Sequence, residues 1–178
     1  MSFLRPSLGF KKDRVSLSLL RPLTISASGK TTFYKTHFYP RYQHINQDIL
    51  KSRDRCLRVA QDALSSPTPQ SVVIDNTNRN RATRALYVAL ANQLNVPIRV
   101  FWFNTPIELA RHNNVYRAFY KPNEERTLLP GMAFSGFASA FERPEAVEGF
   151  DELRIVNFVW EGTEEDKRLW NRYMLETK

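Results

Sequence analysis

The amino-acid sequence predicts an α/β fold with a central parallel sheet of four or five strands flanked by helices. Short apolar runs alternate along the chain with segments of helical periodicity, as they do in βαβ units. The run VVID at residues 72–75 is continuously apolar up to its last residue, which is typical of a strand buried on both faces of a parallel sheet. A Gly-Lys-Thr tripeptide at residues 29–31 stands where a first strand passes into a helix.

Length and composition indicate one globular domain. The 178 residues are 42% hydrophobic and 25% charged, and a chain of this length can bury a sizeable core. The single cysteine, Cys56, excludes an internal disulfide framework and a CxxC metal site. The chain has no run of 18 apolar residues, so we expect no membrane partner. We expect residues 1–19 to be a poorly structured basic N-terminal segment and residues 20–178 to form the domain.

The first half of the domain reads as strand, helix, strand, helix. The segment LLRPLTIS at 19–26 stands where the first strand should be, but Pro22 cannot donate to a sheet ladder and makes this a poor central strand. A short helix is expected at 30–37, followed by a strand at 41–46. Apolar residues at helical spacing then predict one helix over 48–64.

The second half repeats the alternation. A strand over 71–78 leads into a helix over 79–94, and a strand over 96–104 leads into a helix that begins with Thr105 as N-cap and Pro106 at its first position. Residues 120–136 read as a connection that contains proline, glycine and charged residues. The pattern ends with a strand at 152–159 and a helix at 164–175.

The Gly29-Lys30-Thr31 tripeptide matches the end of the phosphate-binding pattern G-x-x-x-x-G-K-[ST], although Thr24 stands where its first glycine would fall. In such a loop, backbone N–H groups at the helix start hold phosphate oxygens, the lysine reaches the β- and γ-phosphates, and the hydroxyl ligates Mg²⁺. A tripeptide of this kind also arises by chance in roughly one chain in ten of this length. The order of strand, loop and helix favours the phosphate site.

Two carboxylates follow predicted strands. Asp75 ends an apolar strand, as a Mg²⁺-positioning aspartate does, or it makes an ordinary Asx turn. Asp48 opens a helix, where aspartate is a good cap, but beside a phosphate site it would also accept a hydroxyl proton. Because the carboxyl ends of parallel strands meet at one edge, we expect Gly29-Lys30-Thr31, Asp48 and Asp75-Asn76 to gather there.

The charge distribution and the remaining polar residues limit the kinds of partner and site that the chain can have. Residues 1–60 carry 12 Lys and Arg against 3 Asp, a balance of +9, and the rest carries 14 basic against 15 acidic residues, a balance of −1. This asymmetry indicates either a polyanionic partner such as a nucleic acid end or a basic tail on a neutral domain. Arg111 on a predicted helix is either a phosphoryl-neutralising arginine or part of a solvated face. His37, His44 and His112 have no zinc-ligand spacing, so we expect no zinc.

The motifs together resemble the kinase domain of the fungal-type polynucleotide 5′-kinase/3′-phosphatases, which repair DNA ends. The resemblance runs from about residue 17 to the end and rests on seven segments in family order: SGKTTF, HINQD, VVIDNTN, ELARHNN, FSGF, FERPEAVEGF and NFVW. The resemblance implies a P-loop NTPase fold of the nucleotide-kinase kind and ATP-dependent transfer of the γ-phosphate to a 5′-hydroxyl in DNA strand-break repair.

The resemblance also implies roles for individual residues. Asp48 would be the general base, with Lys30 and Arg111 acting on the transferred phosphoryl group, and Arg111 belonging to a lid over ATP. The metal ligands would be Thr31 and Asp75, and Arg55 would contact the nucleic acid backbone. The implied cofactors are ATP and Mg²⁺, and the implied ATP-binding set is Ser28, Gly29, Lys30, Thr31, Thr32, Asp75 and Arg111.

Two departures from the family leave alternatives open. Thr24, Ser26 and Ala27 stand where the family has glycine, proline and glycine, so we expect that the sequence upstream of about Ser26 is replaced, by truncation or a mistaken gene model. The D-x-D-G-T motif of the phosphatase is missing, so we expect no 3′-phosphatase activity from this chain. The alternatives are a nucleic-acid-binding domain with a damaged phosphate loop and a small-metabolite kinase of the same fold.

Partners and location follow from the resemblance and the composition. We expect a monomer that acts on nucleic acid 5′-hydroxyl ends, DNA first among them. A nuclear location is expected, with a mitochondrial one as the alternative because the first residues are basic, serine-containing and acid-poor. The choices between DNA and RNA, and between single- and double-stranded ends, stay open.

Overall fold

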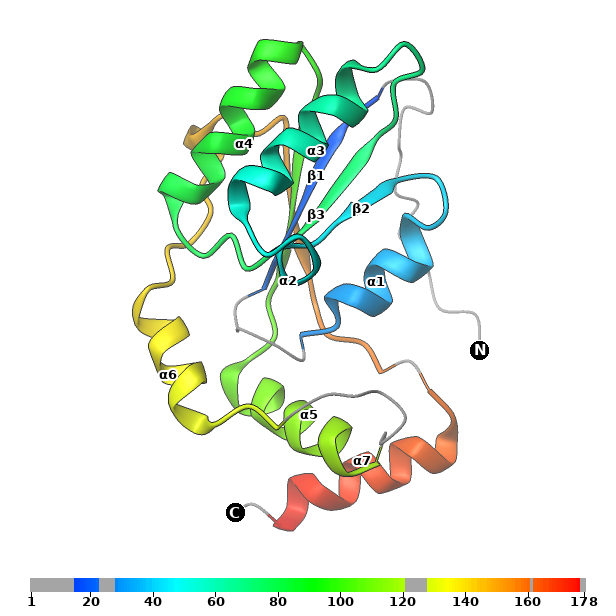
Figure 1. Cartoon of the computed structure of the whole chain (residues 1–178). Helices are drawn as coiled ribbons and strands as arrows, with labels where there is room; N and C mark the ends of the chain where they lie inside the picture. The colour runs from blue at the N-terminus through cyan, green and yellow to red at the C-terminus, as the bar shows by residue number, and fades with distance from the viewer. Residues whose placement is uncertain (1–14, 23–27, 121–127, 161, 177–178) are drawn as a thin grey trace.

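A computed structural model describes residues 15–22, 28–120, 128–160 and 162–176. Within these residues one parallel sheet of five strands runs in the order β2-β3-β1-β4-β5, which confirms the predicted fold class. The strands are β1 (Leu17–Pro22), β2 (Gln43–Ile45), β3 (Val72–Asp75), β4 (Ile98–Phe103) and β5 (Glu152–Val156). Each is paired in parallel with its neighbours, so all five carboxyl ends lie at one edge of the sheet (Figure 1).

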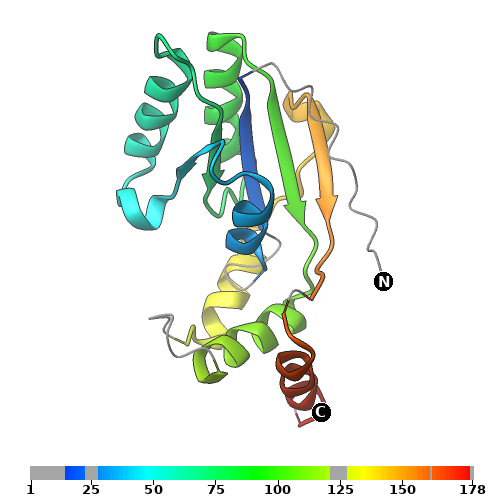
Figure 2. The ribbon, with the colours of Figure 1, turned by 90° about the vertical axis from the view of Figure 1, so that its right-hand side faces the viewer.

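Helices cover both faces of the sheet and its carboxyl edge. In chain order, the helices of the described residues are α1 (Lys30–His37), α2 (Gln47–Leu50), α3 (Arg53–Ser65), α4 (Arg81–Leu94), α5 (Ile107–Tyr120), α6 (Gly131–Ser139), the 3₁₀ turn η1 (Ala146–Glu148) and α7 (Glu164–Glu176). Helices α3 and α4 lie on one face and α1 on the other, while α5, α6 and α7 lie beyond the carboxyl ends of the strands (Figures 1 and 2). No helix in the described residues is both long and apolar enough to span a bilayer.

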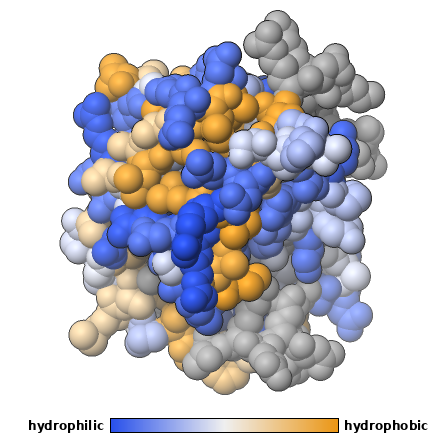
Figure 3. Space-filling view, turned by 45° about the horizontal axis from the view of Figure 1, so that its top comes forward, coloured by the Kyte–Doolittle hydropathy of each residue, from blue (hydrophilic) through white to orange (hydrophobic). Residues whose placement is uncertain are grey.

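Two apolar clusters hold the layers together. The larger one joins the sheet to α3 and α4 through the fully buried Leu17, Ile74 and Tyr87. The smaller one joins the sheet to α1 and is largely aromatic, with Phe33 of α1 packed 5.2 Å and 5.4 Å from the rings of Phe103 and Phe101. The outer surface visible in Figure 3 mixes strips of hydrophilic side chains with apolar ones. The paired clusters fix α1 and α3 on opposite faces of the strands that lead into the site.

The first strand differs from its predicted position. It begins at Leu17 rather than at residue 19, so the expectation of no stable element before residue 20 was wrong for residues 17–19. Leu17, Leu19 and Leu20 are fully buried, and β1 lies between β3 and β4 in the middle of the sheet. Pro22 is the last residue of the strand, where a missing N–H breaks less of the ladder than it would in the interior. Thr24, Ser26 and Ala27 lie outside the described residues.

Two helical boundaries also differ from prediction. The helix expected over 48–64 is divided into α2 and α3, because Lys51 adopts a left-handed conformation with φ 63° and its N–H closes α2 on the Gln47 carbonyl at 2.7 Å. The connection expected over 120–136 contains the start of α6, whose Phe134 and Phe137 are buried. Tertiary burial of these two rings outweighs the helix-breaking tendency of the glycines at 131 and 136.

Candidate active site

The polar residues that follow β1, β2 and β3 meet at one edge, as predicted. These three strands are neighbours in the sheet although 50 residues and more separate β1 from β3 along the chain. Lys30, which begins α1, lies close enough to Asp75 at the end of β3 for its charge to act on that carboxylate. The parallel pairing of the three strands therefore converts distant sequence motifs into one site.

The start of α1 has the backbone geometry of a phosphate-binding helix terminus. Gly29 precedes the helix with φ 88° and ψ 5°, a left-handed conformation that side chains disfavour. A Cβ added at Gly29 would meet no atom of the described residues within 4 Å, so none of these residues fills the space above it. The helix is eight residues long and has no side-chain cap, which leaves first-turn N–H groups available to an anion.

Ser28, immediately before this glycine, is contacted by a residue that follows β4. The Thr105 hydroxyl, fully buried after β4, donates a hydrogen bond to the Ser28 carbonyl at 3.4 Å. The Ser28 hydroxyl is buried and has no partner among the described residues. A buried hydroxyl without a partner is costly unless a ligand satisfies it, so Ser28 is the clearest local sign of a missing polar ligand.

Asp75 is a buried carboxylate surrounded by cationic and polar groups. It is 5% exposed, and its Oδ2 lies 3.1 Å from Nε2 of His44 on the neighbouring strand β2. Burial raises the pKa of Asp75, but the His44 hydrogen bond, the charge of Lys30 and a hydrogen bond from Asn46 together lower it below its ordinary value. The carboxylate is therefore ionised at neutral pH, as a Mg²⁺ ligand must be.

Asn46 lies between the backbone of Asp48 and the carboxylate of Asp75. Its side-chain oxygen accepts the N–H of Asp48 at 2.7 Å and caps α2. Its side chain also lies close enough to Asp75 to help lower the pKa of that carboxylate. The Asp48 side chain is exposed, and no described residue pairs with its carboxylate. Asp48 is thus fixed through its backbone at the start of α2, and its carboxylate has no partner among the described residues.

Asn76 fixes α2 from the end of β3. Its side-chain oxygen accepts the N–H of Gln47 at 2.7 Å, and its amide donates to the hydroxyl of Tyr87 on α4 at 3.3 Å. Asn76 and Tyr87 are both buried. The short helix that carries Asp48 is therefore held in place by the core of the sheet rather than by its own four residues.

The other predicted site residues are less closely gathered. Thr31 and Thr32 lie in the first turn of α1, with Thr31 the more buried of the two. Arg55 is exposed in the first turn of α3, at the same edge of the sheet. Arg111 is exposed on α5 and its guanidinium donates to the Ser135 hydroxyl of α6 at 3.4 Å, and within the described chain no contact joins it to Lys30 or Asp75. The structure thus places Arg111 at the contact between α5 and α6.

The residues present fit a nucleotide phosphate and a divalent cation. The open space above Gly29, the partnerless Ser28 hydroxyl and the charge of Lys30 suit phosphate oxygens. The ionised Asp75 carboxylate supplies the oxygen ligand that Mg²⁺ prefers. The phosphate and the cation would then lie at the same edge of the sheet, as transfer of a phosphoryl group requires.

Sequence reasoning missed three residues that build or support this site: His44, Asn46 and Arg84. The first two lie within the segment HINQD, so the motif pointed to the right place without indicating which side chains touch. His44 was considered only as a zinc ligand, whereas it pairs with Asp75. Arg84 resembles any other arginine of a helix, and nothing in its sequence context signals that it is buried.

The strand order, with β1 between β3 and β4 and a Gly-Lys-Thr helix start after β1, defines a P-loop fold of the nucleotide-kinase kind. The chain belongs to the AAA domain family, which matches residues 25–144. Kti12 of Chaetomium thermophilum, solved in complex with ADP-AlF3, shares this fold at a TM-score of 0.60 and 18% identity, over 90% of this chain and 97% of that one.

Two relatives are similar in sequence as well. A protein of Schizosaccharomyces pombe named bifunctional polynucleotide phosphatase/kinase is 38% identical over 133 residues, which cover 74% of this chain and 31% of the relative. A protein of Acanthamoeba polyphaga mimivirus, provisionally given the same name, is 34% identical over 151 residues, which cover 84% of this chain and 35% of the relative. This chain therefore spans about a third of the length of these relatives, and the resemblance to their family is confirmed.

Proposed function

We propose that this chain is an ATP-dependent polynucleotide kinase that transfers the γ-phosphate of ATP to a 5′-hydroxyl end. The observation that carries the proposal is the anchoring of α2, with Asp48, at the end of β3: Asn76, which follows Asp75, accepts the N–H of Gln47, and Lys30 lies close enough to Asp75 to lower its pKa. A proton acceptor and a phosphate-binding lysine are then held at one edge of the sheet. The names of the two relatives support a polynucleotide as the acceptor.

The reaction follows from where these groups lie. The N–H groups of the first turn of α1 and the charge of Lys30 hold the phosphates of ATP, with the Ser28 hydroxyl as a further donor. The Asp48 carboxylate takes the proton of the 5′-hydroxyl group while the oxygen of that hydroxyl bonds to the γ-phosphorus of ATP. The bond from the γ-phosphorus to the β–γ bridging oxygen breaks, and ADP leaves with that oxygen. Mg²⁺, held by Thr31 and Asp75, would neutralise charge on the phosphate oxygens.

Two arginines complete the proposal. Arg111, on a helix that lies beyond the carboxyl ends of the strands, stabilises the negative charge of the transferred group when the lid of α5 and α6 closes. Arg55, exposed on α3, contacts a backbone phosphate of the acceptor strand. The acceptor in the cell is a DNA strand break, and the protein acts as a monomer in the nucleus.

The test is transfer of labelled γ-phosphate from ATP to a 5′-hydroxyl DNA oligonucleotide, with an RNA oligonucleotide of the same sequence in parallel. Asp48→Asn removes the proposed base and is expected to lower transfer by roughly 10²-fold or more. Asp54→Asn is the matched control, because Asp54 is also an exposed aspartate in a first helical turn, six residues along the chain. Equal transfer by both variants would contradict the role of Asp48.

A chain that binds DNA but neither binds nor hydrolyses ATP would support the alternative of a damaged phosphate loop. The observation that favours this alternative is Thr24, which stands in place of the loop glycine. Turnover of a small sugar or nucleoside with no transfer to an oligonucleotide would instead support a metabolite kinase.

A further inference from the structure

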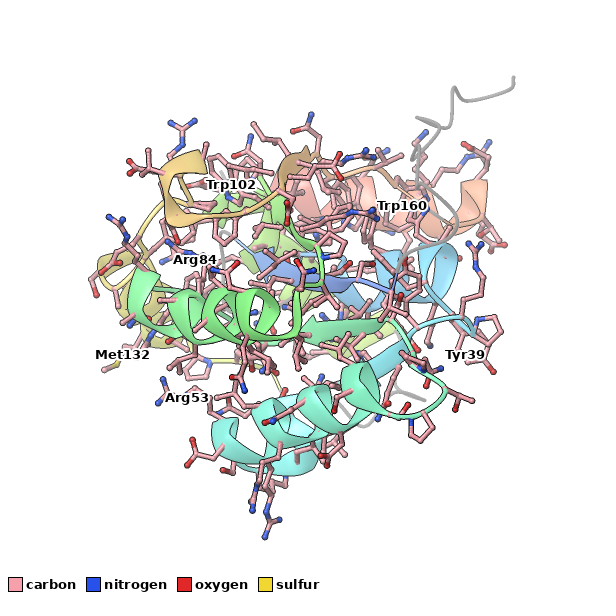
Figure 4. The ribbon with its side chains drawn as sticks, turned by 90° about the horizontal axis from the view of Figure 1, so that it is seen from above. Tyr39, Arg53, Arg84, Trp102, Met132 and Trp160 are labelled. Carbon is pink, nitrogen blue, oxygen red and sulfur yellow. The ribbon has the colours of Figure 1, made fainter. Side chains whose placement is uncertain are left out.

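An ion pair with buried side chains lies next to the loop that follows β3. Arg84 of α4 is 0% exposed and donates two hydrogen bonds to Glu148 of η1: Nε to Oε2 at 2.7 Å and Nη2 to Oε1 at 2.6 Å. Figure 4 shows the Arg84 side chain between α4 and the η1 turn. This parallel, two-bond geometry fixes the orientation of the guanidinium as well as its position.

The remaining face of the guanidinium holds two other segments. Arg84 Nη1 donates to the carbonyl of Asn78 at 3.3 Å and to the carbonyl of Glu142 at 3.1 Å. Glu148 in turn accepts the N–H of Glu145 at 3.0 Å. One buried side chain therefore joins α4, the loop after β3 and the segment 142–148, which are separated by up to 70 residues in sequence.

The loop that Arg84 holds begins at the candidate active site. Asn78 follows Asp75 by three residues, is 1% exposed and has a left-handed backbone with φ 42°. Its side-chain amide donates to the carbonyl of Leu20 in β1, the strand that leads into the phosphate-binding turn. A left-handed backbone is uncommon outside glycine, and even asparagine, which adopts it more readily than most residues, is held there by its surroundings. Arg84 supplies that fixation.

A buried ion pair is poor evidence of a purely stabilising role. Removing two charges from water carries a large desolvation cost, and apolar residues of similar volume often give equal or greater stability in their place. What apolar side chains cannot do is accept or donate the hydrogen bonds that hold the carbonyls of Asn78 and Glu142. The contribution specific to this pair is therefore the placement of the loop.

We propose that Arg84, oriented by Glu148, is a positioning residue that sets segment 75–78 and the end of β1 relative to one another for phosphoryl transfer. The proposal rests on the proposed function, because it assigns the role through Asp75 and the phosphate-binding turn. Arg84 touches neither of the reacting groups. Its effect is expected in the rate of transfer more than in the affinity for ATP.

The test is a double variant, Arg84→Met with Glu148→Leu. It replaces the ion pair with apolar side chains of similar volume and leaves neither partner's charge unpaired. We expect the variant to fold, kcat to fall by roughly 30-fold or more because misplacement of reacting groups is costly, and KM for ATP to change by less than about 3-fold. Hydrogen exchange of the amides of residues 76–80 is expected to speed up by about 10-fold or more, since that loop has lost its anchor.

The matched control is Arg99→Met with Glu152→Leu. That pair lies at 3.5 Å where β4 meets the first residue of β5, at the opposite end of the strands from the site. We expect it to keep wild-type kcat and wild-type exchange of residues 76–80. A loss of kcat equal to that of the Arg84 variant would mean that general sheet packing is responsible and would overturn the proposal.

Arg84→Lys covers the case in which the double variant fails to fold. The lysine keeps the charge but cannot bond Glu148 and both carbonyls at once, so kcat is expected to fall by about 5-fold with faster exchange of residues 76–80. Wild-type kcat and exchange in the folded variants would overturn the proposal. If the wild-type chain transfers no phosphate, the proposed function fails, while the exchange of residues 76–80 still decides whether Arg84 holds the loop.

Discussion

Nε2 of His44 lies 3.1 Å from Oδ2 of Asp75, across the neighbouring strands β2 and β3. The His44 ring is also stacked on Tyr34 of α1, with the centroids 4.1 Å apart and the planes at 17°. The histidine thus joins the helix that begins at the phosphate-binding turn to the carboxylate proposed to ligate Mg²⁺. Because three elements converge on this side chain, the charge of Asp75 influences both the stability of the fold and the proposed chemistry.

Asp75 is expected to stabilise the fold in a pH-dependent manner. Its pKa is lowered in the folded chain from an ordinary 3.8, since the His44 hydrogen bond and the Lys30 charge outweigh the effect of burial. A group with a depressed folded pKa stabilises above its unfolded pKa, and the stabilisation is lost as pH falls through the folded value. The difference in free energy of unfolding between wild type and Asp75→Asn should therefore shrink as pH is lowered from 6 to 3.

Urea denaturation at each pH measures this difference. Asp62→Asn provides the control, since Asp62 is exposed on α3 away from the site. A difference between wild type and Asp75→Asn that stays constant over this range would show that the carboxylate is not stabilised by His44 and Lys30.

Gly29→Ala and Gly136→Ala are expected to have opposite effects. Both glycines have open space where a Cβ would lie, but only Gly29 has a positive φ, at 88°. Alanine at position 29 should destabilise by about 1 kcal/mol and weaken ATP binding, because the new methyl group occupies the open space proposed for a phosphate. Alanine at position 136, inside α6, should stabilise by about 0.5–1 kcal/mol and leave ATP binding unchanged.

Thermal unfolding and titration with ATP separate the two effects of Gly29. Equal affinity for ATP in the wild type and Gly29→Ala would argue against phosphate binding at this turn, whatever the change in stability.

His112 is expected to make the packing of α5 on α7 sensitive to mild acid. It is 8% exposed, and its ring meets Trp170 of α7 edge-on at 4.9 Å. Burial lowers the pKa of His112 and outweighs the backbone hydrogen bond at Trp170, which raises it. The depressed pKa means that stability is present above about 6.5 and is lost as pH falls through the folded value, because the unfolded chain takes the proton more readily.

The wild type should therefore lose more free energy of unfolding between pH 7.5 and pH 5.5 than His112→Phe, in which the ring keeps its contact with Trp170 but cannot titrate. The measurement is denaturation monitored by tryptophan fluorescence, with His37→Phe as the control. An equal loss in wild type and His112→Phe would contradict the prediction.

Arg55 is expected to affect the salt dependence of DNA binding. A side chain that neutralises one backbone phosphate contributes about one unit to the slope of log K against log salt concentration. Arg55→Ala should reduce this slope by about 1, whereas Arg168→Ala, exposed on α7, should leave it unchanged. Fluorescence anisotropy of a labelled oligonucleotide from 50 to 200 mM salt gives both slopes. Identical slopes for the two variants would show that Arg55 does not contact the nucleic acid backbone.

Much of the architecture followed from local pattern. The apolar run of β3 and the helical periodicity of α4 were recognisable because each depends on residues close in sequence. The predicted start of α5 was one residue early, since the helix begins at Ile107 and the Thr105 hydroxyl bonds the Ser28 carbonyl instead of capping it. The convergence of Lys30, Asp48 and Asp75 also followed, since parallel strands must present their carboxyl ends at one edge. Boundaries were harder: β1 extends from Leu17 to Pro22, and the left-handed Lys51 divides α2 from α3.

The sequence by itself therefore determined the class of fold and indicated the turn at Gly29 and the two carboxylates proposed as the site, because hydrophobic periodicity and short motifs are local properties. Only the tertiary structure decided that His44 pairs with Asp75, that Asn76 holds the start of α2, and that Arg84 is buried against Glu148. Each of these contacts joins segments that are distant in the chain. The sequence does not indicate which polar side chains will become partners, because the pairing is set only when packing removes them from water. Desolvation, which makes an unpaired buried polar group costly, is what selects those partners.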